Sequence, residues 1–126
     1  MIADQHAPDV PSKLHILVVE DEMMLMMTLE DALTDAGYTY VTASRIKKAI
    51  ALAEAEAIDC AILDVNLAGE DIYPVAKILS RRNIPFILST GYGRDALPAE
   101  YRERPVLAKP YLPEQVSQAI VTALAR

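Results

Sequence analysis

Five short apolar runs, rich in β-branched residues, alternate with segments of helical periodicity along this chain. The runs are LHILVV from Leu14, YTYVTA from Tyr38, IDCAILDV from Ile58, PFILST from Pro85 and PVLAK from Pro105. The spacing between them leaves room for a crossover each time, and near-continuous apolar strands joined in this way form parallel sheets covered on both faces. The pattern therefore predicts an α/β domain.

Four segments between these runs carry apolar residues at helical spacing. They cover residues 23–36, 45–56, 72–82 and 113–124. Gly37 suits the end of the first helix, and Pro113 suits the first turn of the last one. For five such units the common solution is a doubly wound (βα)5 sandwich with parallel sheet order 2-1-3-4-5. Ligands then bind beyond the carboxyl ends of the strands, at the switch point between strands 1 and 3.

Two segments depart from this regular pattern. The stretch GYGRDALPAEYRER, residues 91–104, contains two glycines and Pro98, which leave room for only a short or frayed fourth helix. We therefore expect mobility there. The run MMLMM, residues 23–27, is expected to lie mostly in the core, with only one or two side chains exposed.

Composition excludes several classes of protein. With 126 residues the chain has room for one domain, which we place at 13–126 after a flexible tail at 1–12. A net charge of −6, without a segregated basic patch, argues against binding nucleic acid. No stretch approaches the roughly 18 apolar residues of a membrane span, and the tail lacks the pattern of a signal peptide. A single Cys60 within an apolar run is expected to be a small buried hydrophobe, and we expect a cytoplasmic protein.

Polar residues stand where the apolar runs end. Glu20 and Asp21 follow the first run, Asp64 the third, Thr90 the fourth and Lys109 the fifth. Because the carboxyl ends of parallel strands share one edge of the sheet, we expect these side chains to converge on one patch. Asp64, which interrupts an otherwise buried strand, is then at the mouth of a pocket.

Three carboxylates brought together repel one another, and desolvation raises their pKa values unless a cation compensates. Oxygen ligands without a His/Cys cluster favour Mg²⁺ over Zn²⁺. Lys109 adds a positive charge and Thr90 a hydroxyl donor, so the set is suited to stabilising a phosphoryl group while a carboxylate attacks. Taken singly, each residue has an ordinary explanation, such as acidic charge at a helix N-terminus for residues 20–22.

Four motifs, ILVVEDE, AILDVNLAG, PFILSTGYG and VLAKPY, occur in this order along the chain. With them the chain resembles the receiver domain of two-component response regulators, over roughly residues 13–125. The resemblance implies the flavodoxin-like form of the (βα)5 sandwich. It also implies a phosphoacceptor that promotes its own phosphorylation and dephosphorylation, and that is not an enzyme in the usual sense.

The same resemblance implies roles for the acidic residues. Asp64 is then the phosphoacceptor, and Glu20 and Asp21 form the acidic pocket beside it. Asp21, Asp64 and the backbone carbonyl of Asn66 bind Mg²⁺, with Glu20 replacing the first aspartate of the usual pair. The extra methylene of Glu20 should alter how the waters on the metal are held, without removing charge.

The resemblance implies a switch as well. Thr90 is the switch hydroxyl, and Lys109 contacts the phosphoryl group and precedes a cis peptide bond to proline. The family has an aromatic switch residue three positions before this lysine, but Val106 stands there, so a rotating ring cannot operate at that place. Tyr92 is a possible substitute.

Two further departures concern the loops. The usual Pro-Gly turn after the phosphoacceptor reads Ala68-Gly69. The motif PFILSTGYG, the short fourth-helix region and the missing aromatic are similar to a stand-alone receiver subgroup with a Phe-Ala-Thr-Gly signature, although Leu88-Ser89 replaces its Phe-Ala.

The predicted function is a phosphorylation switch that takes a phosphoryl group from a sensor histidine kinase or a histidine phosphotransfer protein and acts by contact with a downstream target protein. A receiver-like interaction module that takes no phosphate, indicated by Val106, is an alternative. A phosphohydrolase with an aspartyl-phosphate intermediate is a weaker one. Dinucleotide binding is poorly supported, because the turn after the first run is acidic and lacks glycine.

Overall fold

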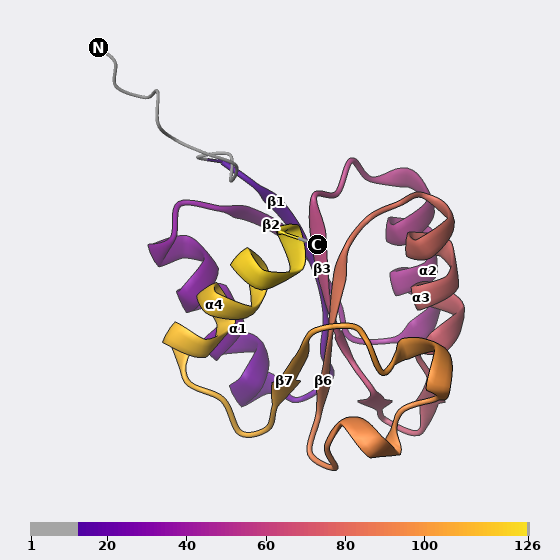
Figure 1. Cartoon of the computed structure of the whole chain (residues 1–126). Helices are drawn as coiled ribbons and strands as arrows, with labels where there is room; N and C mark the ends of the chain where they lie inside the picture. Colours follow the sequence, from indigo (N-terminus) through magenta and orange to yellow (C-terminus); the bar gives the residue numbers. More distant parts are fainter. Residues whose placement is uncertain (1–12, 126) are drawn as a thin grey trace.

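A five-stranded parallel sheet forms the centre of the computed structural model, which describes residues 13–125 (Figure 1). Its strands are β1 (His15–Val19), β2 (Thr39–Ala43), β3 (Cys60–Asp64), β6 (Phe86–Thr90) and β7 (Val106–Ala108), in the spatial order β2-β1-β3-β6-β7. Counted along the sheet strands alone, this is the order 2-1-3-4-5, so the predicted fold class and strand order are confirmed. The predicted tail, residues 1–12, lies outside the described residues.

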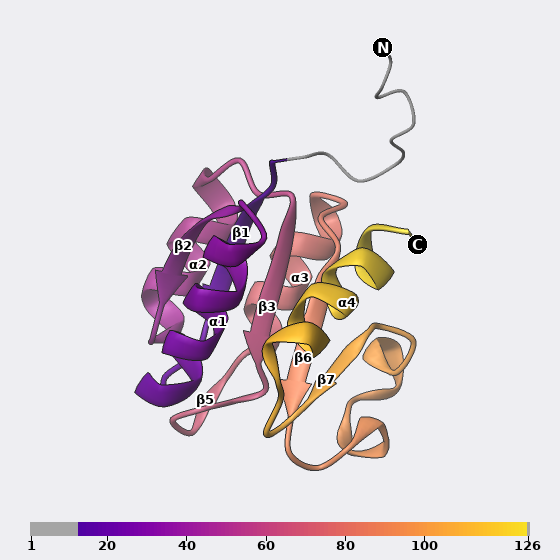
Figure 2. The same cartoon turned by 90° about the vertical axis from the view of Figure 1, so that its left-hand side faces the viewer.

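Four α-helices cover the two faces of the sheet. They are α1 (Met23–Asp35), α2 (Ile46–Ala55), α3 (Tyr73–Arg81) and α4 (Pro113–Leu124), each within one or two residues of its predicted bounds. Helices α1 and α4 pack on one face, and α2 and α3 pack on the other (Figures 1 and 2). None of the helices in the described part of the chain is long and apolar enough to span a membrane.

Alternate side chains of the central strands point into two separate cores. Ile16, Val18 and Ile62 belong to the cluster under α1 and α4, whereas Leu17 and Leu63 belong to the cluster under α2 and α3. All five are at most 1% exposed. Because both faces are buried, the strands read as continuous apolar runs, which is why the sequence pattern identified them.

Cys60 lies on the α1/α4 face of β3 and is fully buried. Burial in apolar surroundings raises the pKa of its thiol to about 12, so the group is a neutral thiol at physiological pH. The prediction of a small buried hydrophobe is confirmed.

A small hairpin that the sequence pattern did not predict follows β3. Strands β4 (Asn66–Leu67) and β5 (Glu70–Asp71) pair antiparallel across a turn in which Ala68 has φ of 49° and Gly69 has φ of 80°. Two positive φ values in succession are typical of a type I′ turn. Proline holds φ near about −65°, so it cannot occupy the position of Ala68 in this turn. The replacement of Pro-Gly by Ala68-Gly69 thus has a backbone consequence.

The segment after β6 contains two short 3-10 helices, η2 (Arg94–Ala96) and η3 (Ala99–Tyr101), in place of an α-helix. This agrees with the predicted short fourth helix. Two arginines brace the segment, because Arg94 Nη1 donates to the carbonyls of Arg102 and Arg104 at 2.6 and 2.7 Å, and Arg102 Nε donates to the carbonyl of Leu97 at 2.9 Å. The mobility of the segment stays a prediction.

Tyr101 anchors the same segment to the α2/α3 core. It is 5% exposed, and its ring stacks on Tyr73 of α3 with centroids 5.2 Å apart and meets the edge of Phe86 in β6 at 6.0 Å. Val106 is only partly buried and packs against the same core. Tyr101 and Val106 therefore belong to one core, in which Tyr101 contacts Phe86 of β6 and Val106 lies on the neighbouring strand β7.

The methionine-rich start of α1 is more exposed than expected. Met23, Met24 and Met27 are 75%, 76% and 52% exposed, and Leu25 and Met26 are partly buried. The prediction that this run lies mostly in the core was wrong. In these first turns only Leu25 and Met26 pack against the α1/α4 core, and the fully buried positions of α1 begin with Leu29.

Candidate functional site

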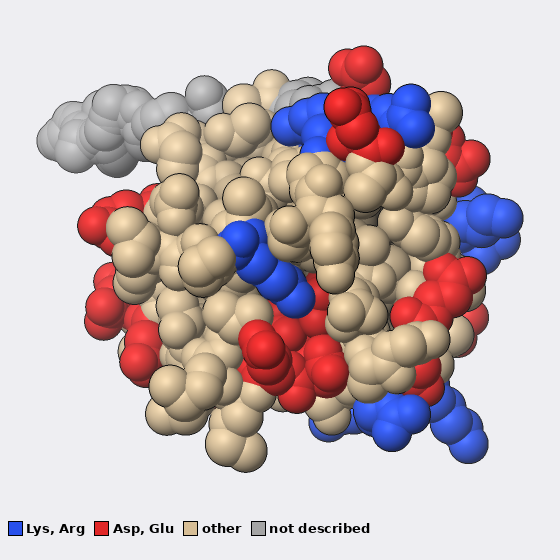
Figure 3. Space-filling view, turned by 90° about the horizontal axis from the view of Figure 1, so that it is seen from below, with Lys and Arg blue, Asp and Glu red and all other residues tan. Residues whose placement is uncertain are grey.

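Three carboxylates converge at the carboxyl ends of β1 and β3. Strands β1 and β3 are neighbours in the sheet, so Glu20 and Asp21, which follow β1, face Asp64, which ends β3. One carboxylate oxygen from each of the three residues lies within 4.8 Å of the others. Figure 3 views this end of the molecule and shows acidic side chains gathered near its middle, next to a basic one. The predicted convergence is confirmed for these residues.

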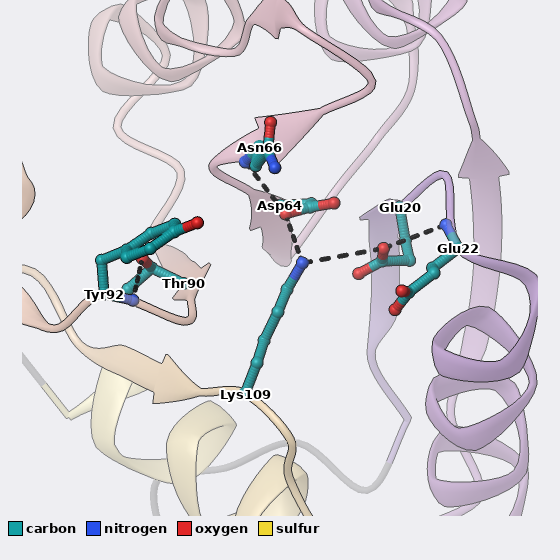
Figure 4. Close-up of polar contacts among 7 residues, drawn as sticks. All are labelled: Glu20, Glu22, Asp64, Asn66, Thr90, Tyr92 and Lys109. Carbon is teal, nitrogen blue, oxygen red and sulfur yellow. Dashed lines mark hydrogen bonds and ion pairs between the residues drawn. The ribbon is translucent and has the colours of Figure 1, made fainter.

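Lys109, which directly follows the edge strand β7, completes the cluster. Its Nζ lies 2.7 Å from Asp64 Oδ1 and 4.0 Å from Glu20 Oε2 (Figure 4). The backbone N–H of Lys109 donates to the carbonyl of Thr90 at 3.0 Å, which fixes the lysine beside the end of β6. The Lys109–Pro110 peptide bond is cis, as predicted.

Asp64 is held in one orientation and is almost fully buried, at 1% exposure. Its Oδ1 accepts hydrogen bonds from Lys109 Nζ and from the backbone N–H of Asn66, the latter at 3.0 Å. Its Oδ2 is buried and has no hydrogen-bond partner among the described residues. A buried carboxylate oxygen that lacks a partner is unfavourable unless a cation or a donor approaches it.

The electrostatics of the cluster also favour a bound cation. Burial, followed by the nearby Asp64 carboxylate, raises the pKa of Glu20 to about 8, and the same two causes raise the pKa of Asp21. For Lys109, burial lowers the pKa, but the hydrogen bond to Asp64 and the charge of Glu20 outweigh it, so the pKa is raised overall. One lysine thus compensates three carboxylates incompletely. Oxygen ligands with surplus negative charge fit Mg²⁺.

The raised pKa of Glu20 predicts how stability depends on pH in the absence of divalent cations. The folded protein binds a proton at Glu20 that the unfolded chain releases above its usual pKa of 4.5. The free energy of unfolding should therefore fall as the pH rises from about 4.5 to about 8. Denaturant unfolding in EDTA at a series of pH values measures this slope.

A Glu20→Gln variant is the control for this slope, because glutamine has no titrating proton at that position. The lowered pKa of Glu70 acts in the opposite direction and only at lower pH, because its usual pKa is 4.5. A Glu20→Gln variant with the same slope between pH 4.5 and 8 as the parent would show that another group carries the effect.

Thr90 lies on the other side of Asp64 from the acidic pair. It lines a pocket of about 290 Å³ together with Asp64, Asn66, Tyr92 and Lys109. Thr90 Oγ1 accepts a hydrogen bond from the backbone N–H of Tyr92 at 3.0 Å, so its own hydroxyl proton remains free to donate (Figure 4). The Tyr92 side chain is 80% exposed.

Asn66 follows Asp64 by two residues and begins β4. Its carbonyl accepts a turn hydrogen bond from Ala68 N–H at 3.2 Å, and a carbonyl oxygen has a second lone pair that can face a cation. Val106, in contrast, is not one of the residues that line the pocket next to Asp64. The structure thus brings the predicted residues together, except Val106.

The sequence analysis did not identify some of the residues that shape the site. Glu70 accepts from Arg45 Nε and Nη2, both at 3.0 Å, and from the backbone N–H of Ile46 at 2.9 Å, which ties the hairpin after Asp64 to the start of α2. The hydrogen bonds from Arg45 lower the pKa of Glu70. The sequence pattern could not predict these contacts, because Arg45 and Glu70 are far apart in sequence and charged residues of these types are common on protein surfaces.

Comparison with known proteins adds an independent line of support. The family model of the response regulator receiver domain matches residues 16–121. The solution structure of SdrG from Sphingomonas melonis Fr1 is 42% identical in sequence with a TM-score of 0.81, and the alignment covers 93% of this chain and 100% of that one. The solution structure of the BeF3-activated conformation of SdrG from Pseudomonas melonis Fr1 is 43% identical with a TM-score of 0.75, covering 87% and 95%.

Curated relatives give the same result. The transcriptional regulatory protein PdtaR of Mycobacterium tuberculosis is 30% identical over 116 residues, which are 88% of this chain and 57% of that protein. The chain spans about half the length of curated relatives such as PdtaR. The resemblance found in the four sequence motifs is confirmed: the chain belongs to the response regulator receiver domain family of two-component signalling.

Proposed function

We propose that this protein accepts a phosphoryl group on Asp64 from a phosphohistidine, carried by a sensor histidine kinase or a histidine phosphotransfer protein. The observation that carries the proposal is the placement of Asp64: a buried carboxylate that is bound by Lys109, faces two further acidic residues, and borders a pocket of about 290 Å³. A carboxylate that served only to neutralise Lys109 would need neither the acidic pair nor the pocket.

The transfer forms one bond and breaks another. An Asp64 carboxylate oxygen attacks the phosphorus, the new O–P bond forms, and the P–N bond to the donor imidazole breaks with its electron pair on nitrogen. Lys109 already lies 2.7 Å from Asp64, so its ammonium group can stabilise charge on an incoming phosphoryl oxygen. The free hydroxyl proton of Thr90 can donate to another oxygen.

Asp21, Asp64 and the carbonyl of Asn66 would hold Mg²⁺, with Glu20 beside them. When bound, the ion would supply positive charge to the phosphoryl oxygens. The oxygen-only donor set, the partnerless Asp64 Oδ2 and the raised pKa of Glu20 support this ligand set. Glu20, which is 1% exposed, is oriented by the backbone N–H of Glu22, which donates to its Oε2 at 3.1 Å.

The test of the function is the mass of the intact protein after incubation with Mg²⁺ and a small acyl phosphate such as acetyl phosphate. We expect a single phosphoryl group that is lost at alkaline pH and that does not form in EDTA. A folded protein that gains no phosphoryl group, under conditions in which a known acyl phosphate survives the measurement, would favour the interaction module that takes no phosphate.

Phosphorylation should change the conformation of residues 91–104. Thr90 Oγ1 accepts from the N–H of Tyr92, so movement of Thr90 towards a phosphoryl oxygen displaces the backbone at Gly91 and Tyr92. With Mg²⁺ and beryllofluoride, a mimic of the phosphoryl group, we expect the largest new protection from hydrogen exchange between residues 91 and 104. Hydrogen-exchange mass spectrometry with and without the mimic measures it.

Thr90→Ala should reduce this protection, because it removes the hydroxyl that links the site to Tyr92. Thr122→Ala, at an exposed position of α4, is the matched control and should behave as the parent. New protection confined to the hairpin after Asp64 would mean that phosphorylation changes a different surface of the protein, and that the proposed role of Tyr92 is wrong.

A further inference from the structure

Two hydroxyl groups lie in the interior beneath the acidic cluster. Ser89, in β6, is 1% exposed, and Tyr111, after β7, is 5% exposed. Neither Ser89 Oγ nor the Tyr111 hydroxyl has a hydrogen-bond partner within residues 13–125, and both atoms are fully buried. Alanine and phenylalanine would have nearly the same shapes without a polar atom, so the presence of both hydroxyls calls for an explanation.

Both hydroxyls lie on the same side of the sheet as Asp64. Ser89 pairs in register with Asp64 of β3 and with Leu107 of β7. Leu107 and Tyr111 belong to the core under α1 and α4, and Asp64 and Ser89 alternate with Leu63 and Leu88, which point into the other core. Ser89 therefore lies between Asp64 and the strand that leads to Tyr111.

The electrostatic surroundings of the Tyr111 hydroxyl include Ser89, Glu20 and Asp64. Burial raises its pKa, the charges of Glu20 and Asp64 raise it further, and the neighbouring Ser89 hydroxyl opposes them. Ser89 and the acidic cluster therefore influence the electrostatics of this hydroxyl, and all of them carry acceptor oxygens.

These two hydroxyls and Asp64 Oδ2 are the three buried side-chain atoms without a partner in the described part of the chain. One is a pure acceptor and two can both donate and accept. No hydrogen bond joins these atoms as they lie in the structure. Small side-chain rotations that let Tyr111 O–H donate to Ser89 Oγ, and Ser89 O–H donate to Asp64 Oδ2, would satisfy all three. A carboxylate oxygen has two lone pairs, so Oδ2 can accept from Ser89 and still face a cation.

We propose that Ser89 and Tyr111 are positioning residues, whose hydroxyls support the Asp64 carboxylate from the α1/α4 side and hold it for Mg²⁺ and phosphoryl binding. The second half of this statement rests on the proposed function of the site. The first half, the coupling of the hydroxyls to Asp64, does not require the metal. Removing a hydrogen bond to a side chain that binds a metal typically weakens metal binding by about 10- to 100-fold.

A double-mutant cycle in EDTA tests the coupling without any metal. Tyr111→Phe removes only a hydroxyl, and its effect on the unfolding equilibrium constant is measured in the parent and in an Asp64→Asn background. We expect the two effects to differ by roughly fivefold, within the range for residues that share one hydrogen-bond network. Tyr40→Phe is the control, because Tyr40 packs against the same core from edge strand β2 and should have equal effects in both backgrounds.

Calorimetric Mg²⁺ titration tests the positioning role. Ser89→Ala and Tyr111→Phe should each weaken binding by about tenfold, and the double variant should be no weaker than either single one, since the two act as one chain. Tyr40→Phe should bind as the parent does.

Equal effects of Tyr111→Phe in both backgrounds would overturn the inference, and so would coupling accompanied by unchanged Mg²⁺ affinity in both single variants. A parent protein that binds no Mg²⁺ would refute the metal in the proposed function instead. The metal-free cycle would then still decide whether the hydroxyls support Asp64.

Discussion

Asp64→Asn is expected to abolish phosphorylation by acetyl phosphate completely. The amide has no carboxylate oxygen to attack phosphorus, whereas its shape allows the hydrogen bonds from Asn66 N–H and from Lys109 to persist through the side-chain oxygen. The mass of the intact variant should equal that of the unmodified chain under conditions in which the parent gains its phosphoryl group.

Asp71→Asn is the matched control for this loss. Asp71 is exposed, lies in the hairpin after Asp64, and accepts from the backbone N–H of Tyr73, a role that asparagine can also fill. It should be phosphorylated as the parent is. A phosphoryl group on the Asp64→Asn variant would show that another residue is the acceptor.

Asp21→Asn is expected to remove most of the Mg²⁺ binding. The substitution replaces one of three converging carboxylates by a neutral amide, and the ion keeps several waters, so few protein oxygens share the affinity. The loss should exceed the roughly tenfold change expected when a residue behind a ligand is replaced. Isothermal titration calorimetry at fixed ionic strength measures it.

Glu22→Gln is the control, because Glu22 is exposed and its hydrogen bond to the cluster comes from its backbone N–H, which the substitution keeps. It should bind Mg²⁺ nearly as the parent does. If Asp21→Asn binds as tightly as the parent, the ligand assignment is wrong, and Glu20 or Glu22 takes its place.

The convergence of the site was predictable because parallel strands fix where their ends lie. Once the apolar runs are taken as parallel strands, Asp64 and Lys109 must meet at one edge of the sheet, although they are 45 positions apart. The strand order places both residues at this end of the sheet, and the long Lys109 side chain reaches past β6 to make the 2.7 Å contact. The metal-binding role of Asn66 and the switch role of Thr90, in contrast, came only from the resemblance to the family.

Contacts between loops were beyond the reach of the pattern. The bond from Arg45 to Glu70 and the bonds from Arg94 to two carbonyls join irregular segments, and apolar periodicity carries no information on such segments. The exposure of Met23 was also missed, because hydrophobicity alone does not show where the sheet stops covering a helix. The buried hydroxyl of Ser89 could have been noticed as a polar residue inside PFILST.

The most direct test of Asp64 as the phosphoacceptor is to locate the phosphoryl group. Borohydride reduces an acyl phosphate to an alcohol but leaves free carboxylates unchanged, so peptide mass spectrometry after reduction identifies the acceptor. We expect reduction at Asp64, dependent on Mg²⁺ and on prior incubation with acetyl phosphate. Reduction at Glu20, Asp21 or any other residue, with Asp64 recovered intact, would contradict it.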